Sequence, residues 1–184
     1  MQNIYVISGP CGCGKSTFAD AFAGHLIATE QRWQVYVIHG DDFHKGFIET
    51  STRLGPSCPG FLYWPDILAF NWECILNVAD RALNKGLDVI IDYVVEDELP
   101  LLIQLAGKHQ AKLFYIVLTA PNDTLTERLR KRGSEDLIER SLFLKEKLDH
   151  AADNQGHLLN NGSSSISQVI SEIRIDDYVV DYLY

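Results

Sequence analysis

The chain has 184 residues, which suits one α/β domain with a substantial core, and we expect a single domain over residues 1–184. Its 46% hydrophobic and 22% charged residues are typical of a globular protein. The formal net charge of −9 argues against a protein that wraps nucleic acid, because neutralising phosphates requires a basic surface. We therefore expect no nucleic-acid partner.

The first residues, Met-Gln-Asn-Ile-Tyr, lack the basic flank and the cleavage site of a signal peptide. The apolar run that they begin is too short to span a membrane. We expect a cytoplasmic protein with no membrane partner.

Residues 9–16 read Gly-Pro-Cys-Gly-Cys-Gly-Lys-Ser, a complete Gly-x-x-x-x-Gly-Lys-Ser phosphate-binding loop (P-loop). An apolar run over residues 3–8 predicts a strand before the loop, and apolar residues at helical spacing over 15–27 predict a helix after it. This context is what the motif requires. The nucleotide-binding residues are therefore expected to be Gly9, Pro10, Cys11, Gly12, Cys13, Gly14, Lys15, Ser16 and Thr17.

In such a loop, backbone N–H groups surround a polyphosphate, and Lys15 reaches its β and γ oxygens. The Ser16 hydroxyl suits a Mg²⁺ ion. The loop predicts ATP as the nucleotide without excluding GTP. A metal site at Cys11 and Cys13 is not expected, because no further ligands follow at a suitable spacing. Both are interpreted as reduced, small side chains at variable positions, because a disulfide would distort the loop and the expected setting is cytosolic.

The rest of the chain alternates strand-like and helical patterns, with an irregular stretch from about residue 43 to 63. Further strands are expected at residues 34–39, 87–95, 112–118 and 156–160. Further helices are expected at residues 65–85, 97–106, 121–132, 136–150 and 165–174. Trp72 lies on the apolar stripe of its helix and is expected in the core.

Strands separated by helices of this length pair in parallel through right-handed crossovers. The expected fold is a three-layer α/β/α sandwich with a five-stranded parallel sheet, in which ligands bind at the carboxyl ends of the strands. The second strand ends at Asp41 and Asp42, and the third ends at Asp92. Three carboxylates and Lys15 are thus expected at one edge of the sheet.

At this point the chain resembles the P-loop small-molecule kinases of the nucleoside monophosphate kinase-like fold, in particular chloramphenicol phosphotransferases and gluconate kinases. Gly-Asp-Asp-Phe-His at 40–44 is similar to the Gly-Asp-Asp-Leu-His of gluconate kinases. Val-Ile-Ile-Asp-Tyr-Val-Val at 89–95 is similar to a strand of chloramphenicol kinases, and residues 118–132 resemble the strand-to-lid passage of the class. Lys45 stands where gluconate kinases usually carry Pro, and the segment at 52–65 matches neither family.

The resemblance implies roles for the acids. Ser16 and, through water, Asp92 would hold Mg²⁺. Asp42 would be the base that accepts the proton of the acceptor hydroxyl, with Asp41 as the alternative. We prefer Asp42 because neighbouring side chains on an extended segment point in opposite directions, so that only one of the pair faces the cleft.

The resemblance also implies a lid at about residues 128–140. Arg128 and Arg132, which share a helix face, would close over the nucleotide and stabilise charge on the moving phosphoryl group. Arg140 is a weaker lid candidate. The exposed end of the helix is expected to carry Arg130 and Lys131.

The irregular segment at about 43–64 is expected to cover the acceptor. Aromatic side chains there can line a pocket for an apolar or ring-bearing molecule. The candidate acceptor-binding residues are His44, Arg53, Tyr63 and Trp64. The acidic and aromatic stretch at 176–184 is expected to pack on the domain or across a homodimer, which leaves a monomer and a homodimer both open.

These observations predict an ATP-dependent kinase that acts on a hydroxyl of a small molecule: a sugar acid, an antibiotic, a nucleoside or another metabolite. Three alternatives remain open. They are a nucleotide-binding regulatory protein, an ATPase without a dedicated acceptor, and a polynucleotide 5′-hydroxyl kinase.

Overall fold

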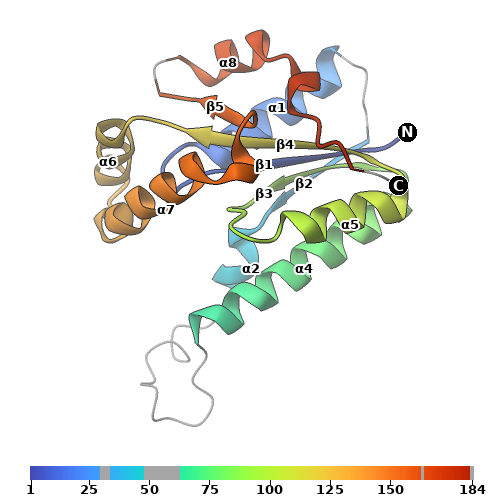
Figure 1. Cartoon of the computed structure of the whole chain (residues 1–184), viewed down its shortest axis with the longest axis horizontal. Coiled ribbons are helices and arrows are strands. Elements are labelled where there is room, and N and C mark those ends of the chain that lie inside the picture. The colour runs from blue at the N-terminus through green and yellow to red at the C-terminus, as the bar shows by residue number, and fades with distance from the viewer. Residues whose placement is uncertain (30–33, 48–62, 163, 183–184) are drawn as a thin grey trace.

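A computed structural model describes residues 1–29, 34–47, 63–162 and 164–182. In it a five-stranded parallel sheet lies between two layers of helices (Figure 1). The strands, in chain order, are β1 (Asn3–Ser8), β2 (Val35–His39), β3 (Asp88–Asp92), β4 (Lys112–Thr119) and β5 (Leu158–Asn160). Their order across the sheet is β2-β3-β1-β4-β5, so the expected fold is confirmed.

The helices follow the predicted pattern closely. They are α1 (Lys15–Thr29), α2 (Asp41–Lys45), α4 (Trp64–Asn84), α5 (Leu99–His109), α6 (Asn122–Lys131), α7 (Ile138–His150) and α8 (Ile166–Glu172). A short 3₁₀ turn, η1 (Glu135–Leu137), leads into α7. One face of the sheet packs against α4 and α5, and the other against α1 and α8 (Figure 1).

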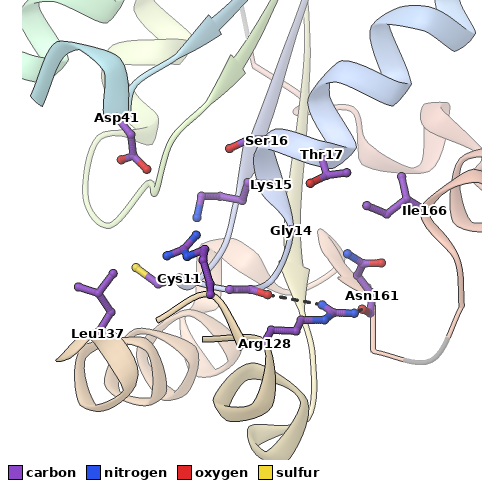
Figure 2. Close-up of a pocket in the computed structure, with 12 residues that line it drawn as sticks. Cys11, Gly14, Lys15, Ser16, Thr17, Asp41, Arg128, Leu137, Asn161 and Ile166 are labelled. Carbon is purple, nitrogen blue, oxygen red and sulfur yellow. Dashed lines mark hydrogen bonds between the residues drawn. The ribbon is translucent and has the colours of Figure 1, made fainter. Parts of the chain in front are cut away.

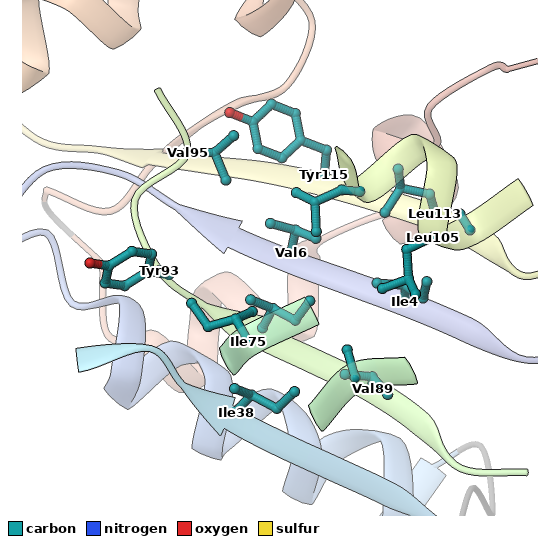
Figure 3. Packing of buried hydrophobic residues seen from close by; sticks show 14 of the residues in the cluster. Ile4, Val6, Ile38, Ile75, Val89, Tyr93, Val95, Leu105, Leu113 and Tyr115 are labelled. Atoms are coloured by element: carbon teal, nitrogen blue, oxygen red, sulfur yellow. The ribbon is translucent and has the colours of Figure 1, made fainter. Parts of the chain in front are cut away.

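The core divides between the two faces because successive strand residues point to opposite sides. Ile4 and Val6 of β1 join the cluster under α4 and α5, whereas Tyr5 and Ile7 join the cluster under α1. Figure 3 shows Ile4, Val6 and Val89 on the first of these faces. A central strand that is buried on both faces reads as a continuous apolar run, as residues 3–8 do.

The C-terminal tail packs on the domain along β4. Val179 forms an antiparallel bridge with Phe114, and the Val180 N–H donates to the Leu113 carbonyl over 2.9 Å. The Tyr182 hydroxyl donates to the Ala111 carbonyl. The tail thus covers the amino-terminal half of β4, while β5 pairs with its carboxyl-terminal half.

Several predicted boundaries differ from the structure by two or three residues, as in the helix expected at 97–106, which is α5 at Leu99–His109. The third strand ends at Asp92 instead of Val95, because the Val95 N–H donates to the Ser8 hydroxyl over 2.9 Å and leaves the ladder. Residues 41 and 42 lie in α2 and not on an extended segment. In the described parts of the chain no helix has the length and apolar character that a membrane span needs.

Candidate active site

The P-loop connects β1 to α1 and depends on three glycines for its shape. The backbone φ is +139° at Gly9, +80° at Gly12 and +94° at Gly14, a region that side chains rarely allow. A Cβ at Gly9 would also lie 2.4 Å from the carbonyl oxygen of Leu118. The motif therefore specifies its own backbone path.

Lys15 folds back over this loop. Its Nζ donates to the carbonyls of Gly9 and Pro10 over 3.0 and 3.2 Å. Burial opposes its charge, but the nearby thiols and the carboxylates of Asp92 and Asp41 outweigh this effect and raise the pKa of Lys15 above its ordinary value. The ammonium is therefore protonated at neutral pH and available to a phosphate.

Three polar side chains hold the carbonyl groups on the outer side of the loop. The Ser141 hydroxyl of α7 donates to the Cys11 carbonyl over 2.7 Å. The Asn161 amide donates to the Cys13 carbonyl over 2.7 Å. Arg128 of α6 donates to the Asn161 carbonyl over 2.9 Å and, more weakly, to the loop (Figure 2).

Holding these carbonyls also orients the loop's N–H groups, because the C=O and N–H of a planar peptide unit point in opposite directions. The N–H of Cys13, for instance, points across the loop to the Pro10 carbonyl at 3.4 Å. Converging N–H groups in such a loop form an anion-binding concavity. The side chains that hold the loop carbonyls are therefore consistent with the polyphosphate site that the motif predicts.

A cavity of about 440 Å³ opens over the loop. We call it the nucleotide cavity. Its walls include Lys15, Ser16, Asp41 and Arg128 (Figure 2). Arg132 lines it as well. Of the other residues expected to bind nucleotide, Cys11, Gly12, Gly14 and Thr17 line it, whereas Gly9, Pro10 and Cys13 are buried behind it.

The cavity also contains residues that sequence reasoning missed. Leu137, Asn161 and Ile166 line it, although they follow the P-loop by more than a hundred residues (Figure 2). Asn161 is only 1% exposed. Its place directly after the fifth strand, at the ligand-binding edge of the sheet, is the signal that could have identified it.

The structure separates the two neighbouring acids on α2. Asp41 lines the nucleotide cavity. Asp42 is exposed and accepts from the Lys45 ammonium over 2.6 Å, and this hydrogen bond holds the pKa of the Asp42 carboxyl below its usual value. The reason for preferring Asp42 was wrong, since the segment is helical and the residue inside the cavity is Asp41.

Asp92 lies at the end of β3, beside the P-loop strand, and is 4% exposed. It is not among the residues that line the cavity. Its Oδ2 is 2.9 Å from Nδ1 of His39, whose Nε2 lies 3.2 Å from a carboxylate oxygen of Asp20. Burial opposes the charge of His39, but these carboxylates outweigh it and raise the pKa of His39.

The basic residues of the expected lid lie in different places. Arg128 and Arg132 line the nucleotide cavity, and Arg132 donates to the Ser134 hydroxyl over 3.1 Å. Arg140 instead forms an ion pair with Glu96 in a second cavity. The residues at the exposed end of α6 are Arg130 and Lys131, as expected.

The acceptor candidates are partly described. His44 contacts Trp64 edge to face, with the ring centroids 5.0 Å apart. Trp64 lines the second cavity, and Tyr63 precedes α4 as an exposed residue. Arg53 lies outside the described residues, as does most of the segment at 43–64. Trp72 is buried, as expected.

The cysteines of the loop behave as expected. Cys11 and Cys13 are free thiols, and burial raises the pKa of the Cys13 thiol. Among the described residues, no group of three or more His, Cys, Asp or Glu side chains is arranged to hold a metal ion.

A family model described as an AAA domain matches residues 6–149, most of the chain. The chain belongs to this family. Among curated proteins, the guanylate kinase of Mycoplasma genitalium is 25% identical over 158 residues, which cover 80% of this chain. The matched part spans 62% of the length of that relative.

Solved structures of kinases have the same fold. A gluconokinase from Sinorhizobium meliloti 1021 matches with a TM-score of 0.58 and 16% identity, covering 96% of this chain and 91% of that one. The APS kinase of Mycobacterium tuberculosis, solved with AMPPNP and APS, matches with a TM-score of 0.62 and 19% identity, covering 93% and 94%. The chain of this AAA domain protein therefore has the P-loop kinase fold, as the sequence resemblance implied.

Proposed function

We propose that this AAA domain protein is an ATP-dependent phosphotransferase that acts on a hydroxyl group of a small molecule. One observation carries the proposal. A single cavity contains the P-loop lysine, two arginines from α6 and its C-terminal end, and a carboxylate from α2. A protein that only binds nucleotide needs the first of these and has no use for the others together.

The basic side chains serve the donor. Phosphoryl transfer depends mainly on positioning and on stabilising charge at the transferring group. Lys15 binds the β and γ oxygens, and Arg128 and Arg132 balance the charge of the moving phosphoryl group from the opposite side of the cavity. Arg128 can serve the nucleotide from its present position at the cavity wall, where it also supports the loop.

Asp41 serves the acceptor. The acceptor oxygen attacks the γ-phosphorus and forms the new P–O bond, while the bond from the γ-phosphorus to the β–γ bridging oxygen breaks and ADP leaves. The hydroxyl proton passes to the Asp41 carboxylate. Asp42 is a poorer base because Lys45 already occupies its carboxylate and lowers its pKa.

Mg²⁺ is the expected cofactor, and it neutralises charge on the β and γ phosphates when bound. The Ser16 hydroxyl suits it, because hard cations prefer oxygen and Ser16 lies in the first turn of α1 at the cavity wall. Asp92, buried behind the cavity and hydrogen-bonded to His39, would act through water.

Two alternatives concern the acceptor. The guanylate kinase relative suggests one whose reacting group is a phosphate instead of a hydroxyl. A regulatory nucleotide-binding protein would have no acceptor. The expectation that nucleic acid is not a partner stays a prediction, as does the choice between ATP and GTP.

The test compares Asp41→Asn with Asp42→Asn, two neighbours with the same chemical change. Calorimetry gives the affinity for Mg·ATP, and acceptor-dependent ADP release over a panel of hydroxyl compounds gives the transfer rate. We expect Asp41→Asn to keep its affinity for Mg·ATP and to lose transfer by about 10²–10⁴-fold, the usual contribution of a general base. Asp42→Asn should behave like the wild type.

If Asp41→Asn transferred phosphate at the wild-type rate, Asp41 would not be the general base. If neither Mg·ATP nor Mg·GTP bound in a saturable manner, the whole proposal would fail. Lys15→Ala is the reference that should lose nucleotide turnover.

A further inference from the structure

A second cavity lies at the same edge of the sheet, beside the first. It has a volume of about 470 Å³ and is lined by Trp64, Leu68, Glu96, Asp97, Glu98 and Arg140. We call it the acidic cavity. The residues come from the start of α4, from the loop after β3, and from α7.

The two cavities are close neighbours. Leu137 lines the nucleotide cavity and Arg140, one helical turn later, lines the acidic cavity. On the other side, Asp41 and His44 are three residues apart on α2, so they share a face of that helix. Asp41 faces the nucleotide cavity and His44 contacts Trp64 of the acidic cavity. Helix α2 therefore connects the proposed base, on the wall of the nucleotide cavity, with the Trp64 side of the acidic cavity.

The two cavities have opposite charge. The titratable residues of the nucleotide cavity include three basic side chains (Lys15, Arg128 and Arg132) and one acid (Asp41). The acidic cavity has three acids and one base. The first arrangement favours an anion and the second opposes one, because a buried anion needs a partner of opposite charge.

The single cation of the acidic cavity is already paired. Arg140 and Lys147 both bond to the Glu96 carboxylate. Asp97 contacts Lys147 only at 3.4 Å, and its side chain is 86% exposed. Glu98 accepts from the backbone N–H groups of Glu96 and Asp97, which fixes its position without cancelling its charge.

Trp64 adds an apolar wall. Its side chain is 51% exposed, although a large aromatic residue gains most by burial. With Leu68 it presents an apolar surface opposite the carboxylates. Exposed indole faces bind aliphatic rings and cations, and cation–π contacts contribute most when the cation is partly desolvated.

We propose that the acidic cavity takes a hydroxyl-bearing small molecule with a positively charged amine, such as an amino sugar or an amino alcohol, and that it disfavours sugar acids and nucleotides. As the acceptor site of a kinase, this inference rests on the proposed function. The amine pairs with Asp97 and Glu98, the carbon skeleton packs on Trp64, and a hydroxyl reaches Asp41. The transfer step is the one given above.

The first experiment measures binding with Mg·AMPPNP in the nucleotide cavity, so that anionic compounds cannot bind to its basic side chains instead. Ligand-observed NMR at pH 7.5 compares kanamycin and glucosamine (cationic) with inositol and uridine (neutral) and with gluconate and GMP (anionic). We expect the cationic compounds to bind at least about tenfold more tightly than the anionic ones. The same compounds are then tested for acceptor-dependent ADP release with Mg·ATP.

Variants locate the effect. Asp97→Lys should weaken the best cationic binder at least about fivefold, because it replaces an attractive charge with a repulsive one. Glu98→Gln keeps an oxygen for the backbone N–H groups and should weaken it about threefold. The control is Asp181→Lys, an exposed acid in the tail, at the opposite end of the sheet. Trp64→Ala should weaken binding and Trp64→Phe should restore most of it.

The outcomes separate the two proposals. Four results would overturn this inference. They are a preference for gluconate or GMP, equal binding of all three classes, no binding of kanamycin or glucosamine at millimolar concentration, and an unchanged affinity in Asp97→Lys. Transfer to an anionic acceptor would also overturn it, while leaving the proposed function intact. Binding of an amine through Asp97 without any phosphoryl transfer would support the amine site and contradict the proposed function.

Discussion

Gly40, which directly precedes the proposed base Asp41, is a glycine because a side chain would not fit there. Gly40 joins β2 to α2 with a helical φ of −61°, so its backbone would accept any side chain. A Cβ at this position, however, would lie 2.4 Å from the ring of Tyr93 and 2.8 Å from the side chain of Ile75. Both neighbours are buried, so neither can move freely. The lack of a side chain at Gly40 thus lets the start of α2 pack directly against Tyr93 and Ile75.

We therefore predict that Gly40→Ala lowers the free energy of unfolding by about 1–3 kcal/mol, the usual effect of overpacking a core. Transfer activity should fall as well, because α2 has to move away from β3. Urea denaturation and steady-state kinetics measure the two effects. The control is Gly24→Ala in α1, where a Cβ meets nothing within 4 Å and the helix should gain about 0.5–1 kcal/mol. Equal stability of the two variants would contradict the packing argument.

Asn161 supports the loop from the outside, and its removal should lower both the stability of the fold and the affinity for nucleotide. Asn161→Ala leaves the Cys13 carbonyl with only the weak contact of Arg128 at 3.5 Å, a change that costs about 1–3 kcal/mol for a buried group. Because the loop needs this carbonyl in place to bind phosphate, we expect the affinity for Mg·ATP to fall about tenfold by calorimetry. Asn77→Ala, an exposed asparagine on α4, is the control. An unchanged affinity in Asn161→Ala would show that the loop keeps its shape without this contact.

At the scale of elements, patterns of eight residues or more were predicted within a few residues. The long helix α4 has strong periodicity, and the buried strands are continuous apolar runs. The shift at the end of β3 has a local cause, since the Val95 N–H donates to the Ser8 hydroxyl. The five residues of α2 are too few for a helical period to be visible. Missing that helix led directly to the preference for Asp42.

One acid connects two helices of the same layer. Asp80 of α4 accepts from Lys108 and His109 of α5 over 2.5 and 2.7 Å. These hydrogen bonds, first that of Lys108 and then that of His109, hold the pKa of the Asp80 carboxyl below its usual value. A carboxyl whose pKa is lowered by folding stabilises the protein above its unfolded pKa, and this contribution is lost as the pH falls toward the folded pKa.

Asp80→Asn should accordingly destabilise the protein by about 1 kcal/mol at pH 7, with a smaller difference from the wild type as the pH falls below about 4. Denaturation curves from pH 7 to pH 3 provide the comparison. Glu73→Gln, an exposed acid on the same helix, should differ little from the wild type at any pH. A pH-independent effect of Asp80→Asn would mean that packing, and not charge, connects the helices.

At the scale of the whole molecule, the tail completes the edge of the sheet. Its side chains alternate between the two cores: Val179 packs against the cluster under α1, whereas Val180 and Tyr182 pack against the cluster under α4 and α5. This is the period of a strand. The tail thus fills the part of the β4 edge that the short strand β5 leaves open (Figure 1).

Removing residues 179–184 should lower the free energy of unfolding by roughly 2–4 kcal/mol, because two partly buried valines, a tyrosine and their hydrogen bonds are lost. The affinity for Mg·ATP below the unfolding transition should stay the same, since both termini lie at the opposite end of the sheet from α6 (Figure 1). Denaturation and calorimetry on the shortened chain test both statements. A loss of nucleotide affinity in the folded chain would indicate that the tail reaches the site.

The site was only half predictable for a related reason. The P-loop is local, so its glycines, Lys15 and Ser16 could be assigned from eight consecutive residues. The supports of the loop are not local: Asn161 and Ser141 reach it across 148 and 130 residues of sequence. Neither follows from any motif, because the order of the strands across the sheet brings them there.

Helix α7 and the residue before it border both cavities and support the P-loop between them. Leu137, just before it, borders one cavity, Arg140 borders the other, and the hydroxyl of Ser141 holds the loop between them. These three side chains lie within two turns of one helical segment. If a molecule that fills one cavity tilts α7, the side chain that borders the other cavity would move with it, and the order in which the two molecules bind would then depend on this helix.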